Sequence, residues 1–285
     1  MINICLSPPY DDELIEKAKK PVEVKGHTRA TKTGKVTQVR AYQEHREAAA
    51  GADTGVTLDI LRSTLNEFGL TVQEVSSVPE AARTAMKMTE PKAYTQEQRM
   101  AARGIGDAFH ALKDNVMLGK LRGAVKNIPV VFACYEPTMA AMSYLHGGGY
   151  AALLVNTAYE NAEAVADPAR AQSFAAREAA HAVQASGSID EGITTLYRIS
   201  TWHEYGHMLD TLLGGDLTNA LIDNLMLQFG TKMAAISKWV TTHISLYAMA
   251  SPNDTTAEAF SMYMGRKAPK ELTPWLELAG LTHPS

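Results

Sequence analysis

The sequence predicts an α+β protein that is mostly helical, on three observations. Apolar residues recur at helical spacing over several stretches, as in Leu58–Phe68. Two short apolar runs, 128–134 and 151–155, have the length of strands and lie together in the middle of the chain. Helices and strands do not alternate regularly, which favours a small sheet packed with helices over a βαβ architecture.

The expected elements can be placed in order along the chain. Gly69 ends the first helix, and Gly214-Gly215 ends a later one that carries the chemistry described below. The strand at 151–155 follows three consecutive glycines, 147–149. The helices are expected at 58–68, 79–88, 96–118, 167–184, 193–214, 217–240 and 251–266.

Composition divides the chain into three parts. Residues 1–50 are expected to form a basic, partly ordered arm, because Lys17–Arg46 is rich in Lys, Arg and Thr and poor in large apolar residues. Such an arm is either a solvated linker or a docking segment for an acidic partner or nucleic acid. A small helical segment, 51–90, and a main domain, 91–285, follow after a Gly-rich boundary. With 46% hydrophobic residues, the 285-residue chain can bury one sizeable core.

The net charge and the cysteine content limit which binding partners and which cellular compartment can be expected. The net charge of −4 gives no reason to expect nucleic acid or an anionic membrane as a partner. Cys5 and Cys134 are too few for a disulfide framework and are expected to be free thiols. The N-terminus does not resemble a secretory signal, and no run of about 18 apolar residues occurs. We therefore expect a soluble protein that is made in the cytoplasm.

One segment carries a catalytic signature. Residues 203–207 read His-Glu-Tyr-Gly-His, the H-E-x-x-H pattern, within an apolar helical stretch. Residues four apart lie on one helix face, so the imidazoles of His203 and His207 can meet one ion at about 2.0–2.1 Å each. Glu204 is rotated by about 100° from His203, where it can take a proton from a water that the ion activates. The pattern predicts a zinc site with Glu204 as general base.

A two-histidine zinc site needs a third protein ligand and an open position for water. The extended pattern H-E-x-x-H-x-x-G-x-x-H is absent, because Asp210 and Leu213 occupy the positions of its glycine and its third histidine. Asp254 and Glu258 are the downstream candidates: they are four residues apart, so one can bind the ion while the other hydrogen-bonds a ligand histidine. Asp254 also has a structural interpretation, because Ser251–Asp254 reads as an N-cap, a first-turn proline and a first-turn acid.

The segment 203–210, followed by Tyr247 and by Ala257-Glu258-Ala259-Phe260, resembles the catalytic domain of anthrax toxin lethal factor and related zincin domains of bacterial toxins and phage proteins. The resemblance covers about residues 145–265. It implies a zincin-like fold, with a small twisted sheet and an active-site helix. It also implies that Tyr247 hydrogen-bonds the substrate or the developing oxyanion, that Asp254 is the third zinc ligand and that Glu258 supports a ligand histidine. The family has Glu where this chain has Asp254, so here the helix must approach the metal more closely.

Two further assignments stay open. Asp210 is either an orienting partner for a ligand histidine or a backbone group, or an ordinary surface acid. In zincins an edge strand above the active-site helix pairs with the substrate backbone, and the matching segment here is 149–156. It offers the residues Tyr150, Ala151, Ala152 and Leu153. The other interpretation of this segment is a plain core strand.

Together these observations predict a zinc-dependent endopeptidase that hydrolyses a peptide bond in a protein substrate. The resemblance and the short basic stretch in the arm favour a phage or prophage origin, with association with a virion and contacts to other virion proteins through the arm. The alternative is a virion structural or assembly protein that keeps the fold with a vestigial or stabilising metal site. A toxin-like effector would share the chemistry and differ only in its target. Other divalent ions also suit a site of two imidazoles and one carboxylate.

Overall fold

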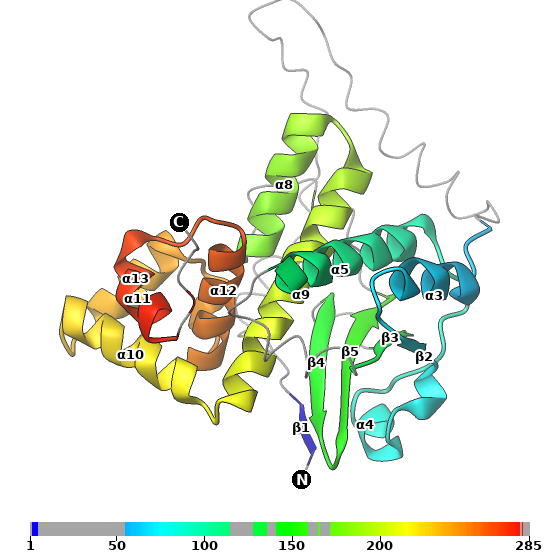
Figure 1. Ribbon diagram of the computed structural model, residues 1–285, viewed down its shortest axis with the longest axis horizontal. Helices are drawn as coiled ribbons and strands as arrows, with labels where there is room; N and C mark the ends of the chain where they lie inside the picture. The colour runs from blue at the N-terminus through cyan, green and yellow to red at the C-terminus, as the bar shows by residue number, and fades with distance from the viewer. Residues whose placement is uncertain are drawn as a thin grey trace, which may run out of the picture. The chain divides into compact units, whose positions relative to one another are not determined.

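The computed structural model describes residues 2–4, 55–114, 128–135, 141–158, 165, 172–279 and 281 (Figure 1). Apart from residues 55 and 56, these belong to one compact unit. The boundary expected near residue 90 does not divide that unit, because residues 57–90 supply a strand to the same sheet as the later segments. The expected arm, 1–50, lies outside the described residues except for 2–4.

Five strands of the described residues form one mixed sheet, in the order β1-β4-β5-β3-β2. The β1–β4 and β4–β5 pairs are antiparallel, whereas β3 pairs in parallel with both β5 and β2. With the helices described below, this sheet confirms the α+β class. The strands are β1 Ile2–Ile4, β2 Val72–Gln73, β3 Val130–Ala133, β4 Met142–Gly147 and β5 Tyr150–Asn156.

Strand β4 was not expected from the sequence, and it forms a tight hairpin with β5. Gly147 pairs with Tyr150, which leaves Gly148 and Gly149 as a two-residue turn with φ values of 60° and 81°. Both values lie in the left-handed region that glycine adopts without strain, as a type I′ turn requires. The three glycines therefore join two strands rather than precede a single one.

The expectation that β5 is a substrate-binding edge strand is wrong. Leu153 pairs with Tyr144 of β4 on one side and with Val130 of β3 on the other, so β5 is an inner strand. Tyr150, Ala151 and Ala152 also pair with β4. From Leu153 to Val155 both sides of β5 are paired, so this part of the strand has no free edge for an extended peptide. The strand that lies beside the H-E-x-x-H helix is β4.

Most of the expected helices form. The stretch 217–240 is two helices, because α10 ends at Gly230 and α11 starts at Met233. Helix α13 was not expected, and the expected ends at 115–118 and 167–171 lie outside the described residues. The helices are α3 Leu58–Asn66, α4 Glu80–Ala85, α5 Gln96–Asp114, α8 Phe174–Ser186, α9 Ile189–Leu212, α10 Asp216–Phe229, α11 Met233–His243, α12 Pro252–Met264 and α13 Thr273–Leu278, with 3₁₀ turns η1 Val75–Ser77, η4 Tyr247–Met249 and η5 Lys270–Leu272.

The two faces of the sheet are covered by different helices. On one face, Val131, Leu145 and Leu154 pack with residues of η1 and α4 in one buried cluster. On the other face, Thr201 of α9 contacts Met142 of β4 through its hydroxyl, 3.5 Å from the sulfur. Helix α9 runs between the sheet and the group of helices α10–α13 (Figure 1). It is therefore buried on several sides, and the structure surrounds the H-E-x-x-H residues with protein.

Within the described part of the chain, no helix combines the length and the apolar character that crossing a bilayer requires.

Candidate metal centre

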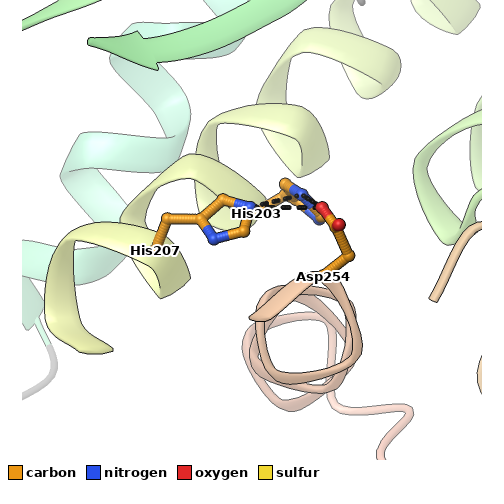
Figure 2. Close-up of side chains that lie close together, drawn as sticks. All are labelled: His203, His207 and Asp254. Atoms are coloured by element: carbon orange, nitrogen blue, oxygen red, sulfur yellow. Dashed lines mark hydrogen bonds and ion pairs between the residues drawn. The ribbon is translucent and has the colours of Figure 1, made fainter. Parts of the chain in front are cut away.

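Three side chains that could bind a metal meet between α9 and α12. The Nε2 atoms of His203 and His207 are 3.1 Å apart, and Asp254 Oδ1 lies 3.6 Å and 3.5 Å from them, respectively. Figure 2 shows both rings turned toward the Asp254 carboxylate. All three residues are buried, with 4–8% of their surface exposed. Among the described residues, they form the one group of potential ligand atoms that lie within 4.8 Å of one another.

The separations suit a tetrahedral zinc site. Three ligands at about 2.0–2.1 Å from a shared zinc ion lie about 3.3 Å from one another. The observed spacings of 3.1 Å, 3.5 Å and 3.6 Å bracket that value. The donor set of two imidazoles and one carboxylate is one that zinc uses in catalytic sites, with a fourth position left for water or substrate. The residues therefore fit the metal that the sequence predicts.

Asp254 reaches the histidines while it also stabilises the start of α12. Ser251 is the N-cap, and its hydroxyl accepts a hydrogen bond of 3.1 Å from the Asp254 N–H. The same hydroxyl donates to Asp254 Oδ2, which leaves Oδ1 directed at the two imidazoles. Pro252 stands in the first helical turn, as the sequence indicated. The capping and ligand interpretations of Asp254 are thus compatible, because each uses a different oxygen.

Glu258 lies against the other ring nitrogen of His203. Its Oε1 is 3.3 Å from His203 Nδ1, and its Oε2 accepts a hydrogen bond of 2.8 Å from the Phe174 N–H at the start of α8. With a metal bound, the single imidazole proton would sit on Nδ1, facing the Glu258 carboxylate, and the Nε2 lone pair would face the ion. Glu258 is therefore placed to orient His203, with its own position fixed by the Phe174 amide.

The acids of α12 shift the protonation of the cluster. Burial lowers the pKa of His203, but its contacts with Asp254 and Glu258 outweigh that effect and raise the pKa to about 10. Burial raises the pKa of Asp254, but its contacts with His203 and His207 hold the pKa well below its usual range. Without a cation, the cluster is thus a buried imidazolium beside a carboxylate. Binding of a divalent cation to such a cluster would release the proton of the imidazolium.

Glu204 lies next to the cluster on the side of the sheet. Burial raises the pKa of its carboxyl, while His203 and His207 lower it in part. A hydrogen bond with the backbone of Tyr144 on β4 also lowers the pKa. A carboxylate with a raised pKa accepts protons more readily near neutral pH, which suits a general base.

Tyr247 approaches the cluster from η4. Its ring centroid lies 5.6 Å from that of His203, at an interplanar angle of 57°. The Tyr247 N–H donates a hydrogen bond of 3.0 Å to the Gln172 carbonyl, two residues before Phe174. The segment 172–174 therefore holds both the backbone of Tyr247 and the carboxylate of Glu258. This link could not be predicted from the sequence, because both contacts use backbone groups of that segment.

No protein-family model, curated protein or solved structure matches this chain. The chemistry of the site therefore rests on its own residues.

Asp210 does not contact a ligand histidine. Its carboxylate accepts hydrogen bonds from the Thr218 N–H at 3.0 Å and from the Thr218 hydroxyl at 2.8 Å. Thr218 lies in the first turn of α10, whose N-cap residue, Gly215, offers no side chain. Asp210 thus acts as a backbone partner that caps α10 from α9, one of the roles that the sequence left open. The Thr218 hydroxyl is 2.9 Å from that of Thr256, which ties this cap to α12.

Proposed function

We propose that this chain is a zinc-dependent endopeptidase that hydrolyses a peptide bond in a protein substrate. The observation that carries the proposal is the buried convergence of His203, His207 and Asp254, with Glu204 beside them. Burying two imidazoles and a carboxylate is unfavourable unless they share a proton or a cation. A purely structural role does not require these side chains to be buried together.

The three ligands and Glu204 would divide the chemistry between them. When bound, a zinc ion would polarise the substrate carbonyl and lower the pKa of a water at the open position. Glu204 removes a proton from the attacking water as its oxygen bonds to the carbonyl carbon. Glu204 then gives that proton to the amine nitrogen as the carbon–nitrogen bond breaks. The products are a carboxylic acid and an amine, and Glu204 returns to its starting state.

Tyr247 would stabilise the negative charge that develops on the carbonyl oxygen. Its ring lies beside His203, and its backbone is held by Gln172. A phenol held in this position donates a hydrogen bond to the oxygen at the moment the charge appears. Glu258 serves the same reaction indirectly, because it fixes the orientation of the His203 ring.

The protein substrate and the zincin-like fold come from the resemblance of residues 203–210, Tyr247 and 257–260 to lethal-factor-type domains. A mixed sheet, a helix with H-E-x-x-H beside it and a later helix with the third acid support that assignment. The same resemblance favours a phage or prophage source. Action within a virion is an extension of this proposal, and its proposed docking arm falls in residues that the structure does not describe.

The test compares wild type with Glu204→Gln, and uses Glu191→Gln as a matched control on the same helix. Glu191 is exposed in the first turn of α9, far along the helix from the cluster. We expect all three proteins to bind one equivalent of zinc by elemental analysis after dialysis. Wild type and the Glu191 variant should cleave members of a fluorescence-quenched peptide library. The Glu204 variant should retain zinc and lose cleavage by about 10²-fold or more.

Two results would overturn the proposal. A wild-type protein that takes up no zinc under these conditions has no metal centre to catalyse hydrolysis. A wild-type protein that binds zinc but leaves the library intact would favour a stabilising metal site instead, as in the assembly-protein alternative.

A further inference from the structure

Strand β4 and helix α9 run alongside each other, and residues of the two elements interact in three successive pairs. Met142 contacts Thr201, the Tyr144 backbone hydrogen-bonds Glu204, and His146 interacts electrostatically with His207. Successive pairs are two residues apart on β4, a rise of about 6.6 Å, and three residues apart on α9, a rise of about 4.5 Å. The pairs therefore follow one another in the same direction along both elements. Alternate side chains of a strand share a face, which puts His146 on the same face as Met142, toward α9.

His146 is the last of these residues before the hairpin turn. Its ring stacks on Tyr144, with centroids 5.0 Å apart and an interplanar angle of 16°. It is half-buried, whereas Met142 and Tyr144 are buried. An imidazole ring offers at least one N–H donor in either protonation state.

The reacting atoms must lie on the β4 side of the cluster. Asp254 and Glu258 cover the side that faces α12, and Tyr247 covers His203. Glu204 faces β4, as its hydrogen bond with the Tyr144 backbone indicates. Because Glu204 takes the proton of the attacking water in the proposed reaction, that water and the substrate carbonyl lie between α9 and this face of β4.

His146 does not belong to the metal cluster itself. Its ring nitrogens are outside the set of three ligand atoms that lie within 4.8 Å of one another. A third imidazole beside a metal site, too far away to bind the ion and partly open to solvent, is in a position to contact what the ion binds.

We propose that His146 is a further substrate-contacting residue, whose imidazole hydrogen-bonds the oxygen of the reacting carbonyl from the His207 side, opposite Tyr247. The inference rests on the proposed function, because it assumes that a carbonyl binds at the metal. The site then has two side-chain donors to one oxygen, Tyr247 from η4 and His146 from β4. Neither donor is a metal ligand.

The experiment uses the full chain loaded with Co²⁺, whose visible spectrum reports ligands that join the metal. Acetohydroxamic acid, which presents a carbonyl oxygen to the metal, is titrated into wild type and three variants. His146→Leu keeps bulk without a hydrogen-bonding group, and His146→Gln keeps a donor. His181→Ala is the control, because it removes an exposed histidine of α8 that pairs with Glu178. Thermal unfolding checks that each variant is folded.

We expect all four proteins to bind Co²⁺ equally. The Kd for acetohydroxamic acid should rise about 5- to 10-fold in His146→Leu, rise less in His146→Gln and stay unchanged in His181→Ala. On any library peptide that wild type cleaves, kcat/KM should fall in the same order.

Equal hydroxamate binding by folded His146→Leu and wild type would overturn this inference while the proposed function stands. A loss of Co²⁺ in His146→Leu would also overturn it, since His146 would then support the metal. Failure of wild type to bind Co²⁺ would overturn both proposals. If His146→Leu does not fold, His146→Phe replaces it, because a phenyl ring can keep the stacking on Tyr144 and has no hydrogen-bond donor. A raised Kd in that variant supports the inference, and a Kd equal to that of wild type overturns it.

Discussion

Gly206 of α9 packs directly against Ala257 of α12. A Cβ atom at position 206 would lie 2.8 Å from the Ala257 Cα and 3.2 Å from the Phe260 Cβ. Gly206 stands between the two ligand histidines, and Ala257 stands between Asp254 and Glu258. This contact therefore sets the distance between the helix that supplies the imidazoles and the helix that supplies the acids. A close approach is what the short aspartate side chain requires if it is to reach the histidines.

Gly206→Ala should separate the two helices and weaken the metal site. Alanine gains up to about 1 kcal/mol of helix propensity over glycine. Overpacking against a backbone atom costs about 1–3 kcal/mol, because the neighbour cannot move aside as a flexible side chain does. We expect a net loss of stability in thermal unfolding and a weaker zinc affinity by chelator competition.

The matched control is Gly192→Ala on the same helix. There the added Cβ would meet Val183 Cγ2 on α8, at 2.3 Å, away from the metal ligands. This variant is expected to change stability and to keep the zinc affinity of wild type. Equal zinc affinities in both variants would mean that the α9–α12 distance does not govern the site.

The identity of the third ligand can be tested by comparing Asp254→Ala with Glu258→Ala. Loss of a residue that only supports a ligand typically weakens metal affinity by about 10- to 100-fold. Because Asp254 Oδ1 faces both Nε2 atoms, we expect its loss to exceed about 100-fold. Glu258 contacts only Nδ1 of His203, so its loss should stay within the lower range. The reverse order of affinities would make Glu258 the ligand.

The Phe174 amide should support the metal site through Glu258. Phe174 is the first residue of α8, where proline is tolerated, and Ser173 before it has extended backbone angles that suit a following proline. Phe174→Pro removes both the ring and the N–H, whereas Phe174→Ala removes only the ring. We expect zinc affinity to be several-fold weaker in the proline variant than in the alanine variant. This difference should disappear in a Glu258→Ala background, and its persistence there would show another cause.

The sequence predicted which three side chains come together because each of them carries a local signal. The helical spacing of His203 and His207 indicates that they share one face. Asp254 is indicated by its place after Ser251-Pro252 and by the resemblance to lethal-factor-type domains. The order of the strands carries no such signal. β1 and β2 have three and two residues, too few for a periodic pattern, and their pairing joins distant parts of the chain. The inner position of β5 depends on those pairings and on β4.

Strand β4, the interaction of His146 with His207 and the helix break at Gly230 were not predicted from the sequence, for different physical reasons. β4 mixes Ser143, Tyr144 and His146 with apolar residues, so it lacks the continuous apolar run of its neighbours. His146 and His207 are about 60 positions apart in the sequence, and they interact electrostatically only because β4 packs along α9. Gly230 was a visible break within 217–240, and it does end α10.

The metal-free protein should lose stability as pH rises. The folded-state pKa of His203, about 10, exceeds its ordinary 6.5, so its contribution is complete below pH 6.5 and is lost as pH rises toward 10. The raised pKa of Glu204 adds to this trend above pH 4.5. The lowered pKa of Asp254 acts oppositely: its contribution is present above pH 3.8 and is lost in stronger acid. Melting temperatures in EDTA should therefore fall between pH 6.5 and 9.

The variant His203→Gln removes the main titrating group and should flatten that decline. With zinc present the trend should reverse between pH 5 and 7, because ligand imidazoles must lose their protons before they bind the ion. A metal-free melting temperature that rises from pH 6.5 to 9 would contradict the charge state that the cluster implies.

Tyr247→Phe should impair catalysis without weakening the metal site. The phenol would act only on the charged oxygen of the transition state, and loss of one such donor costs about 10²- to 10³-fold in kcat. The ring itself, which lies 5.6 Å from that of His203, is kept by phenylalanine, so zinc affinity and stability should stay near those of wild type. Leu246→Ala is the neighbouring control, because Leu246 is exposed beside Tyr247. A Tyr247→Phe protein that retains full kcat on a library peptide would contradict the role of Tyr247 as a donor to the oxyanion. The negative charge would then have to be stabilised by the metal and by His146, which makes the Tyr247 and His146 variants most informative when both are combined in one chain.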